Sequence, residues 1–335
     1  MTELRKDYLI DRWVIVAPER RKRPSDFKFD RGQRDDGEKC PFCPGNEHMT
    51  TPAIQLYIYK NGEIITDRDR GDIRLKGWSL RVIKNMFPAL SPSDKFEEFS
   101  EGLKFWRNGA GEHEVIIESP DHNGQIQNLD EKQLHLIFRA YRERFNALKG
   151  LPFVKYISLY RNYGRAAGAS LTHPHSQIVA VPMIPEHVAE EVKVCKESWT
   201  GDKCIYDKVI ESEISSERFV SESKNAVAFC PFASCSPFEV WIMPKRHLHN
   251  IAQLTEIELK DFANFTQKIL SAYHTLLNGP PYNYAFQQTI SNKEYHFHLR
   301  IYPRLIIHAG FEMCTGIIIN YMSPEYAAGF LREAV

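Results

Sequence analysis

The chain lacks an excess of charge of either sign. Its 335 residues include 43 Lys and Arg and 43 Asp and Glu, so the formal net charge is zero. A protein without a broad positive field is not expected to bind nucleic acid or an anionic membrane surface, and any phosphate must be held by local groups. In this neutral context we interpret the basic cluster at 20–23 as a solvated loop.

Long hydrophobic runs are also absent. No apolar segment reaches the roughly 18 residues that a membrane-spanning helix needs, and the first residues, Met-Thr-Glu-Leu, are too polar for a secretory signal. We therefore expect a cytoplasmic protein with no membrane partner. With 43% hydrophobic and 26% charged residues, a chain of this length can bury one large core or two modest ones.

Cysteine is scarce and unevenly placed. The seven cysteines are an odd number and lie scattered, apart from Cys40 and Cys43, so we expect no disulfide framework. Two thiolates at this spacing can coordinate one tetrahedral Zn²⁺ from one side. A lone pair of this kind also occurs in redox sites or by chance. Because the chain has no second such pair, any further metal ligands must be histidines or carboxylates from elsewhere.

The chain contains an internal repeat. A strand-like segment at 114–122 leads into an amphipathic segment at 129–148, and a strand-like segment at 239–247 leads into another at 254–277. Each copy runs in the order strand, Pro, His, helix. A strand-like run with alternating histidines then follows each predicted helix.

The histidines of the two copies keep nearly the same spacing. His122 and His247 are 125 residues apart, and His173 and His296 are 123 residues apart. Offsets that agree this closely predict a duplicated α+β unit, in which antiparallel strands carry a helix on one face.

The most informative segment is 173–177, with the sequence His-Pro-His-Ser-Gln. It places two imidazoles and an amide in alternation, and a period of two puts these side chains on one face of a strand. The small residues at 166–170 let a ligand approach the backbone closely, and the apolar run at 178–182 favours a strand. A single His is usually structural, but this combination indicates a phosphate site that faces His175.

A neighbouring histidine completes a metal prediction. His122 ends the strand that should lie beside the strand of His173, so we predict a closed Cys₂His₂ zinc site formed by Cys40, Cys43, His122 and His173. A zinc site with four protein ligands is structural. Its role here is to hold the backbone of His173, and so the ring of His175, in place.

The second copy differs from the first in its chemistry. Its segment at 296–300 reads His-Phe-His-Leu-Arg, so Arg300 stands where the first copy has Gln177. The second copy also lacks the run of small residues. We therefore expect the reaction at the first copy, while the second copy serves structure, a second metal, or ligand contacts in this or a partner subunit.

These motifs together resemble a known family. The His-Pro-His-Ser-Gln segment, the Cys40/Cys43 pair and the Ser-Pro-Asp-His turn at 119–122 are similar to those of the galactose-1-phosphate uridylyltransferase family, within the histidine triad superfamily. The resemblance runs along nearly the whole chain, from the segment at 13–18 to the second pair of histidines.

The resemblance implies a fold and a catalytic residue. The fold is α+β, with duplicated histidine-triad-like units and an antiparallel half-barrel sheet on which helices pack. Residues 1–188 form the expected N-terminal domain and residues 189–335 the C-terminal domain. His175 is the implied nucleophile, which becomes nucleotidylated, and Gln177 is the implied hydrogen-bond partner of the phosphate.

The resemblance also implies substrate and metal contacts. The implied substrate-binding residues are Arg20 and Arg23 in a basic motif that acts across a dimer, Asn85 and Phe87 at the nucleotide, and Asn162, Gly168 and Ser170 at the phosphate or sugar. A second metal is bound in some relatives by a Glu and three His, and by position Glu191, His296 and His298 are its candidate ligands here.

A homodimer is the expected assembly. The resemblance implies shared active sites, and the aromatic segments around Phe105, Trp106, Phe286 and Tyr295 could supply apolar surface for a partner to cover.

The implied activity is transfer of UMP from UDP-glucose to galactose 1-phosphate, with zinc as the cofactor, by a ping-pong mechanism through nucleotidyl-His175. Three alternatives stay open at this point: phosphorolysis of ADP-glucose, hydrolysis of nucleotides by a histidine triad enzyme, and a noncatalytic zinc-dependent binding protein. Gln177, which cannot titrate, argues against the hydrolase. The intact His175 argues against the noncatalytic protein.

Overall fold

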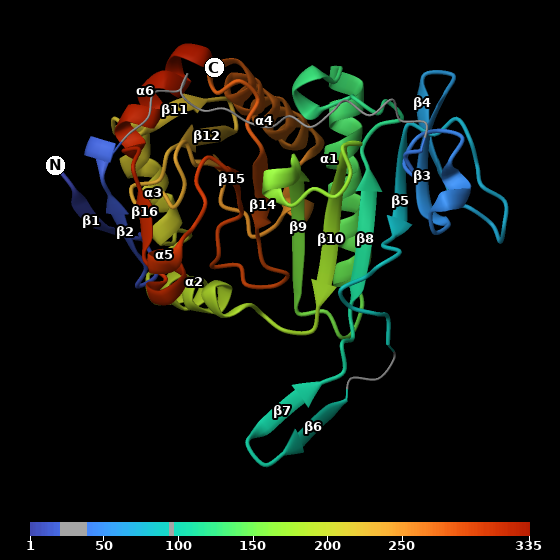
Figure 1. Cartoon of the computed structure of the whole chain (residues 1–335), viewed down its shortest axis with the longest axis horizontal. Coiled ribbons are helices and arrows are strands. Elements are labelled where there is room, and N and C mark those ends of the chain that lie inside the picture. The colour runs from blue at the N-terminus through green and yellow to red at the C-terminus, as the bar shows by residue number, and fades with distance from the viewer. Residues whose placement is uncertain (21–38, 94–96) are drawn as a thin grey trace.

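The computed structural model describes residues 1–20, 39–93 and 97–335. Within these residues, eleven strands form one antiparallel sheet (Figure 1), in the order β11 (Phe219–Glu222), β12 (Ala226–Phe229), β13 (Val240–Pro244), β15 (His298–Pro303), β14 (Tyr282–Gln287), β9 (Tyr156–Tyr163), β10 (His175–Val181), β8 (Glu112–Ile117), β5 (Leu80–Lys84), β3 (Ala53–Lys60) and β4 (Glu63–Asp67). The helices are α1 (Glu131–Lys149), α2 (Glu186–Glu197), α3 (Ile205–Ile214), α4 (Glu256–Leu276), α5 (Gly310–Thr315) and α6 (Pro324–Ala334).

The order of the strands repeats about the centre of the sheet. From the central pair β9 and β14, one side runs β9, β10, β8, β5 and the other runs β14, β15, β13, β12. A long helix follows β8 in the first half and β13 in the second. The predicted α+β fold with a duplicated antiparallel unit is therefore confirmed. One continuous sheet joins the halves, and the predicted domain boundary at 188 lies within α2.

Local signals fix the two long helices. The Asp130 carboxylate accepts a hydrogen bond from the Gln133 amide at the start of α1, and Thr255 and Glu258 form a capping box at the start of α4. Their apolar stripes pack against each other and against the sheet. Among the described residues, no helix combines the length and the apolar character needed to span a membrane.

Both faces of the C-terminal half of the sheet are buried, because successive side chains of its strands pack into cores on opposite sides. Ala228 of β12 and Ile242 of β13 face the core that contains α1 and α4. Their neighbours Phe229 and Trp241 face the opposite core, which contains α2 and α3. Because successive residues of a strand point to opposite faces, each of these strands contributes to two layers of helix packing.

Two smaller sheets flank the main one. The strand β2 (Trp13–Val16) pairs antiparallel with β1 (Glu3–Lys6) and parallel with β16 (Ile318–Asn320). The strands β6 (Glu98–Glu101) and β7 (Lys104–Arg107) form a hairpin that projects away from the body of the molecule (Figure 1).

Only part of the aromatic surface predicted for an interface is accessible. Phe105 and Trp106 of the hairpin are 60% and 47% exposed. Phe286 and Tyr295 are buried instead, in the cores on either side of the sheet. The interface prediction is therefore wrong for these two residues, because Phe286 lies on the central strand β14 and Tyr295 lies in a turn that packs into the core with α2 and α3.

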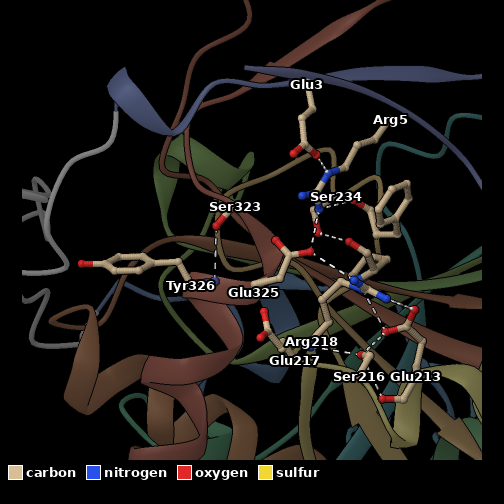
Figure 2. Close-up of polar contacts among 12 residues, drawn as sticks. Glu3, Arg5, Glu213, Ser216, Glu217, Arg218, Ser234, Ser323, Glu325 and Tyr326 are labelled. Carbon is tan, nitrogen blue, oxygen red and sulfur yellow. Dashed lines mark hydrogen bonds and ion pairs between the residues drawn. The ribbon is translucent and has the colours of Figure 1, made fainter. Parts of the chain in front are cut away.

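Ion pairs attach the N-terminal strand to the end of the chain (Figure 2). Glu325 Oε1 of α6 lies 2.8 Å from Arg5 Nη1 and 3.1 Å from Arg218 Nη1, and Arg218 also pairs with Glu213 at 2.8 Å. Arg5, Arg218 and Glu325 line a surface pocket. Because carboxylates already pair with both arginines, this pocket is a poor match for a phosphate group.

Candidate functional site

His175 opens the central strand β10, between β9 and β8. Its Nδ1 lies 2.9 Å from the backbone oxygen of His173. A carbonyl oxygen can only accept, so Nδ1 carries the proton and Nε2 keeps its lone pair. The residue is 8% exposed, and this burial lowers the pKa of His175. The structure therefore presents a neutral imidazole with a nucleophilic Nε2.

Gln177 lies two residues further along β10, on the same face as His175. Its Oε1 lies 2.8 Å from His113 Nε2 and 3.1 Å from the Tyr160 hydroxyl, which donates to it. The Ala89 amide donates to His113 Nδ1 at 3.1 Å, so the proton of a neutral His113 lies on Nε2 and is donated to Gln177. With its oxygen held by two donors, Gln177 presents its NH₂ group as a donor to a ligand.

A buried polar network holds β10 from its other face. Ser176 points toward α1 and shares the Glu118 carboxylate with the Tyr141 hydroxyl. Arg161 Nε of β9 lies 2.9 and 3.2 Å from the two oxygens of the same carboxylate. Glu118 and Arg161 are almost completely buried. A buried charge pair with its hydrogen bonds satisfied specifies one arrangement, so this network fixes the position of the strand that carries His175.

The four predicted zinc ligands come together in the structure. One ligand atom each from Cys40, Cys43, His122 and His173 lies within 4.8 Å of the other three. Cys43 Sγ is 3.2 Å from His122 Nδ1 and 3.5 Å from His173 Nδ1. The other nitrogen of His173 donates to the Ser119 carbonyl at 2.8 Å, which aims Nδ1 into the cluster.

The chemistry of this donor set fits a metal ion. Burial lowers the pKa of His173 to about 4, so its ring is neutral, as a ligand must be. Two thiols and two imidazoles match a closed tetrahedral site with four protein ligands. This Cys/His cluster can therefore hold a metal.

The loop between the two cysteines also contacts the predicted nucleophile, through Phe42. The ring of Phe42, between the two cysteines, lies edge-on to His175 with ring centroids 5.3 Å apart, and to His173 with centroids 6.0 Å apart. The loop that carries the thiols therefore forms one wall around the imidazole of His175.

The predicted nucleotide contacts follow β5, which pairs with β8 beside β10. The side-chain nitrogen of Asn85 lies 3.1 Å from His113 Nε2, and its oxygen accepts from the Phe87 amide. The ring of Phe87 is 85% exposed. An exposed aromatic face of this kind is available for stacking on a base.

The predicted phosphate and sugar contacts lie on the other side of His175. The Asn162 oxygen accepts from the Asn283 amide at 2.8 Å, and the same amide nitrogen donates to the Ala167 carbonyl at 2.7 Å. These bonds tie the small-residue loop to the sheet. Gly168 has a φ of 85°, a conformation that favours glycine, and Ser170 is exposed.

The two arginines predicted to act across a dimer cannot be placed. Arg23 lies outside the described residues. Arg20 ends the short 3₁₀ helix Pro18–Arg20, and its side chain also lies outside the described part of the structure.

The structure does not assemble the predicted second metal site from Glu191, His296 and His298. Arg300 Nη2 lies 2.8 Å from Glu191 Oε1, and Arg300 Nε donates to His298 Nε2 at 2.9 Å. The guanidinium thus uses both of these groups and brings its own positive charge to the place where a cation was expected. The residues that gather near His296 are different ones: Cys204, Asp207 and His247.

Sequence reasoning missed five contributors to the site: Phe42, His113, Glu118, Tyr141 and Tyr160. Only Phe42 had a signal in the sequence, because it stands between the two cysteines. The others belong to no motif, and their contacts with 173–177 arise from strand register and helix packing.

Comparison with known proteins identifies a family for the whole chain. The N-terminal domain of galactose-1-phosphate uridyl transferase matches residues 75–185, and the C-terminal domain of the same enzyme matches residues 157–315. An ADP-glucose phosphorylase of Arabidopsis thaliana is 36% identical over 99% of this chain and 92% of its own length. A galactose-1-phosphate uridylyltransferase of Thermotoga maritima is 31% identical over 99% of this chain and 98% of its own.

A solved structure extends the similarity to the whole fold. The crystal structure of an ADP-glucose phosphorylase from Arabidopsis thaliana with bound ADP-glucose has a TM-score of 0.79 and 32% identity, and it covers 100% of both chains. With matches to both family domains and relatives above 30% identity over almost its full length, this chain belongs to the galactose-1-phosphate uridylyltransferase family.

Proposed function

We propose that this chain is a nucleotidyltransferase that acts on nucleotide sugars through a covalent nucleotidyl-His175 intermediate. The observation that carries the proposal is the orientation of the His175 ring: the His173 carbonyl holds the Nδ1 proton, which leaves Nε2 as the nucleophile. The donor NH₂ group of Gln177 lies on the same face of β10. Relatives named as uridylyltransferases and as an ADP-glucose phosphorylase support this reaction class.

Two displacements at phosphorus follow from this arrangement. Nε2 attacks the α-phosphorus of the donor, a P–N bond forms, and the bond to the oxygen of the departing sugar 1-phosphate breaks. An acceptor phosphate oxygen then attacks the same phosphorus, and the electron pair returns to Nε2. The Gln177 amide meets the negative charge on the phosphoryl oxygens in both steps. Ping-pong kinetics are the expected result.

The metal proposed at Cys40, Cys43, His122 and His173 is zinc. The donor set is the one that closed structural zinc sites use, and it leaves no position for a substrate. When bound, the ion would supply rigidity to the backbone at His173 and to the loop that carries Phe42. Both of these groups contact His175.

UDP-glucose with galactose 1-phosphate as acceptor is the first candidate pair of substrates. We assign the base to Asn85 and Phe87, and the phosphate and sugar to Asn162, Gly168 and Ser170. The exposed ring of Phe87 and the small-residue loop tied down by Asn283 support this assignment.

ADP-glucose with inorganic phosphate is the second candidate pair. Two specific observations favour it: the 36% identity to an ADP-glucose phosphorylase, and the 32% identity of the solved phosphorylase structure with bound ADP-glucose. The covalent chemistry at His175 is the same for both pairs. Only the base and the acceptor differ.

A matched set of incubations separates the candidates. The purified protein is given UDP-glucose or ADP-glucose, each with galactose 1-phosphate or with phosphate, and release of glucose 1-phosphate is followed. Release from UDP-glucose that requires galactose 1-phosphate supports the first pair, and release from ADP-glucose that requires phosphate supports the second. Absence of release from every combination by folded, metal-loaded protein would contradict the proposed reaction class.

The hydrogen bond to Gln177 Oε1 from Tyr160 gives a mild, specific test. Tyr160→Phe removes one of the two donors that orient the amide, which is worth about 1 kcal/mol, or roughly a fivefold decrease in kcat. The KM for the nucleotide-sugar donor should change much less than kcat, because the aromatic ring of residue 160 remains in place. Steady-state kinetics measure both values. Tyr163→Phe, on the same strand, is the matched control, and an equal decrease in kcat there would contradict the orienting role.

Glutamine at position 177 is expected to protect the intermediate from water. Before the second step, nucleotidyl-His175 is exposed to water at roughly 55 M while it lacks an acceptor. The Gln177 amide cannot accept a proton near neutral pH, so it cannot activate that water. A histidine there, with an ordinary pKa of about 6.5, could help water to attack. We expect Gln177→His to raise the ratio of donor hydrolysis to transfer, measured as free nucleotide against transferred nucleotide. An unchanged ratio would mean that Gln177 does not protect the intermediate from water.

We also propose a homodimer in which the hairpin β6–β7 covers a second copy. Leu103, Phe105 and Trp106 expose apolar surface on an arm that projects from the body. Light scattering should give about twice the 38.9 kDa mass of one chain. Leu103→Glu with Trp106→Glu should yield monomers, whereas Ile73→Glu, at another exposed apolar residue, should not. A wild-type monomer with full activity would refute the dimer.

A further inference from the structure

One buried histidine joins the loop that follows β5 to the catalytic strand β10. His113 lies on β8, and the residue is 7% exposed. Its Nδ1 accepts a hydrogen bond from the Ala89 amide at 3.1 Å, and its Nε2 lies 2.8 Å from Gln177 Oε1. The carbonyl oxygen of His113 also accepts from the Asn85 amide at 2.8 Å. His113 therefore holds the loop at two points and contacts the Gln177 amide with the same ring.

The Ala89 amide determines which nitrogen of His113 carries the proton. A backbone N–H can only donate, so Nδ1 keeps its lone pair and the proton of the neutral ring lies on Nε2. This Nε2–H needs an acceptor, and Gln177 Oε1 is the atom at 2.8 Å. If the Gln177 amide were turned over, two N–H donors would face each other. The ring thus selects one orientation of Gln177, with the NH₂ group turned away from His113.

The same proton leaves the side-chain NH₂ group of Asn85 without an acceptor on the ring. Asn85 Nδ2 lies 3.1 Å from His113 Nε2, but a protonated Nε2 has no lone pair to offer. The Asn85 oxygen is already used, since it accepts from the Phe87 amide at 2.9 Å. The NH₂ groups of Asn85 and Gln177 are therefore both held next to His113 as donors. Two such donors can meet the phosphoryl oxygens of a nucleotide.

The other partner of the Gln177 amide lies on the opposite side of β10. The Tyr160 hydroxyl of β9 donates to Gln177 Oε1 at 3.1 Å. In the order of the sheet, β9 adjoins one edge of β10, whereas β8 and β5 lie beyond the other. Tyr160 thus helps to orient the amide from the side away from the loop. His113 is the partner that approaches from the side of the loop.

We propose that His113 is a positioning residue that couples recognition of the base to the orientation of Gln177. The inference rests on the proposed function, in which residues 85–87 meet the nucleotide and Gln177 meets the phosphoryl oxygens. A base held by the loop steadies the His113 ring through the Ala89 hydrogen bond. The ring in turn holds the Gln177 NH₂ group toward the phosphorus that His175 attacks. Nδ1 therefore serves binding, and Nε2–H serves the chemical step.

Two substitutions separate the roles of the two ring nitrogens. An asparagine can place its oxygen near the position of Nδ1, and a glutamine can place its NH₂ group near the position of Nε2. We expect His113→Asn to lower kcat about fivefold with little change in the KM for the nucleotide sugar, because only the bond to Gln177 is lost. His113→Gln should raise that KM about fivefold and keep kcat, because only the bond to Ala89 is lost. His274→Asn, at an exposed histidine of α4, is the matched control and should change neither constant.

Kinetics in which both variants change kcat and KM alike would overturn the division between the nitrogens. Hydrogen exchange adds a readout that needs no substrate: the amides of segment 85–89 should exchange faster in His113→Gln than in wild type or in His113→Asn. Equal exchange in all three proteins would overturn the link to the loop. If the variants do not fold, nitrogen NMR of the wild-type protein decides, because it should show the Nε2–H tautomer of His113. The Nδ1–H tautomer would overturn the proposal.

Binding separates a failure of this inference from a failure of the proposed function. If wild-type protein turns over no nucleotide sugar, the proposed reaction is wrong, and calorimetry with UDP-glucose and ADP-glucose then tests His113 alone. His113→Gln should weaken the binding of the preferred nucleotide sugar about fivefold, while His113→Asn should not. Equal affinity of the two variants, or no binding of either nucleotide sugar to wild-type protein, would overturn the coupling.

Discussion

His175→Asn is expected to abolish both half-reactions, with a loss of transfer of at least about 10⁴-fold. The asparagine has no ring nitrogen at the position of Nε2, so no bond to phosphorus can form. A donor labelled in the nucleotide should leave label on the wild-type protein that survives alkali and is lost in mild acid, as a phosphoramidate would be. The variant should take up no label. Gel autoradiography of the quenched protein measures this directly.

The control for this prediction is another histidine. His308 is exposed and distant in sequence from 173–177, so His308→Asn should be labelled like wild type. Metal content and circular dichroism must show that His175→Asn is folded and keeps its metal. Label on a folded His175→Asn protein would remove this residue from the mechanism and with it the covalent proposal.

The duplicated fold could be predicted from the sequence because the signals are periodic and local. Amphipathic segments predicted at 129–148 and 254–277 are α1 at Glu131–Lys149 and α4 at Glu256–Leu276. The nearly equal offsets between histidines indicated the repeat. In the structure, the repeat is seen in the strand order, which is symmetric about β9 and β14. The hairpin β6–β7 belongs to no repeat, so nothing in the pattern predicted its projection from the body.

The chemistry of the site was predictable only where it lies in a short motif. His175 and Gln177 are two residues apart on one strand, and their shared face follows from its period. His173 departs from that pattern: β10 begins at His175, and the His173 ring turns to Cys43 and the Ser119 carbonyl. His113 and Tyr160 reach Gln177 only because β8 and β9 both pair with β10, and such register is not visible in separated segments of sequence.

Strand alternation explains why Arg300 contacts His298, one of the predicted ligands of a second metal. His298 and Arg300 are two residues apart on β15, so their side chains share a face, and Arg300 Nε donates to His298 Nε2 at 2.9 Å. An arginine that is permanently charged at this spacing excludes a second cation at the same nitrogen. Positional correspondence with relatives gave no sign of this contact between Arg300 and His298. The sequence itself did, because Arg300 follows His298 by two residues.

Loss of the zinc ion proposed at Cys40, Cys43, His122 and His173 is the other change with a large expected effect. Cys43→Ser removes a sulfur that lies 3.2 Å from His122 Nδ1 and 3.5 Å from His173 Nδ1. Since a site of this kind contributes its binding free energy to folding, we expect loss of the ion from that site and a destabilisation of at least about 3 kcal/mol, or a decrease in Tm of roughly 5–10 °C. Elemental analysis and thermal melts measure both values. Cys314→Ser, at an exposed thiol, should change neither.

Activity should decrease in Cys43→Ser even in the fraction that remains folded. The His175 ring is held by the His173 carbonyl and by Phe42, and both belong to segments that the Cys/His cluster brings together. When that connection is lost, Nε2 is no longer held at a fixed angle to the phosphorus, and a small misplacement costs about 10²-fold in rate. Slow labelling of His175 in a folded, metal-free variant would therefore be the expected signature. Wild-type rates of labelling there would show that the protein positions His175 without the metal.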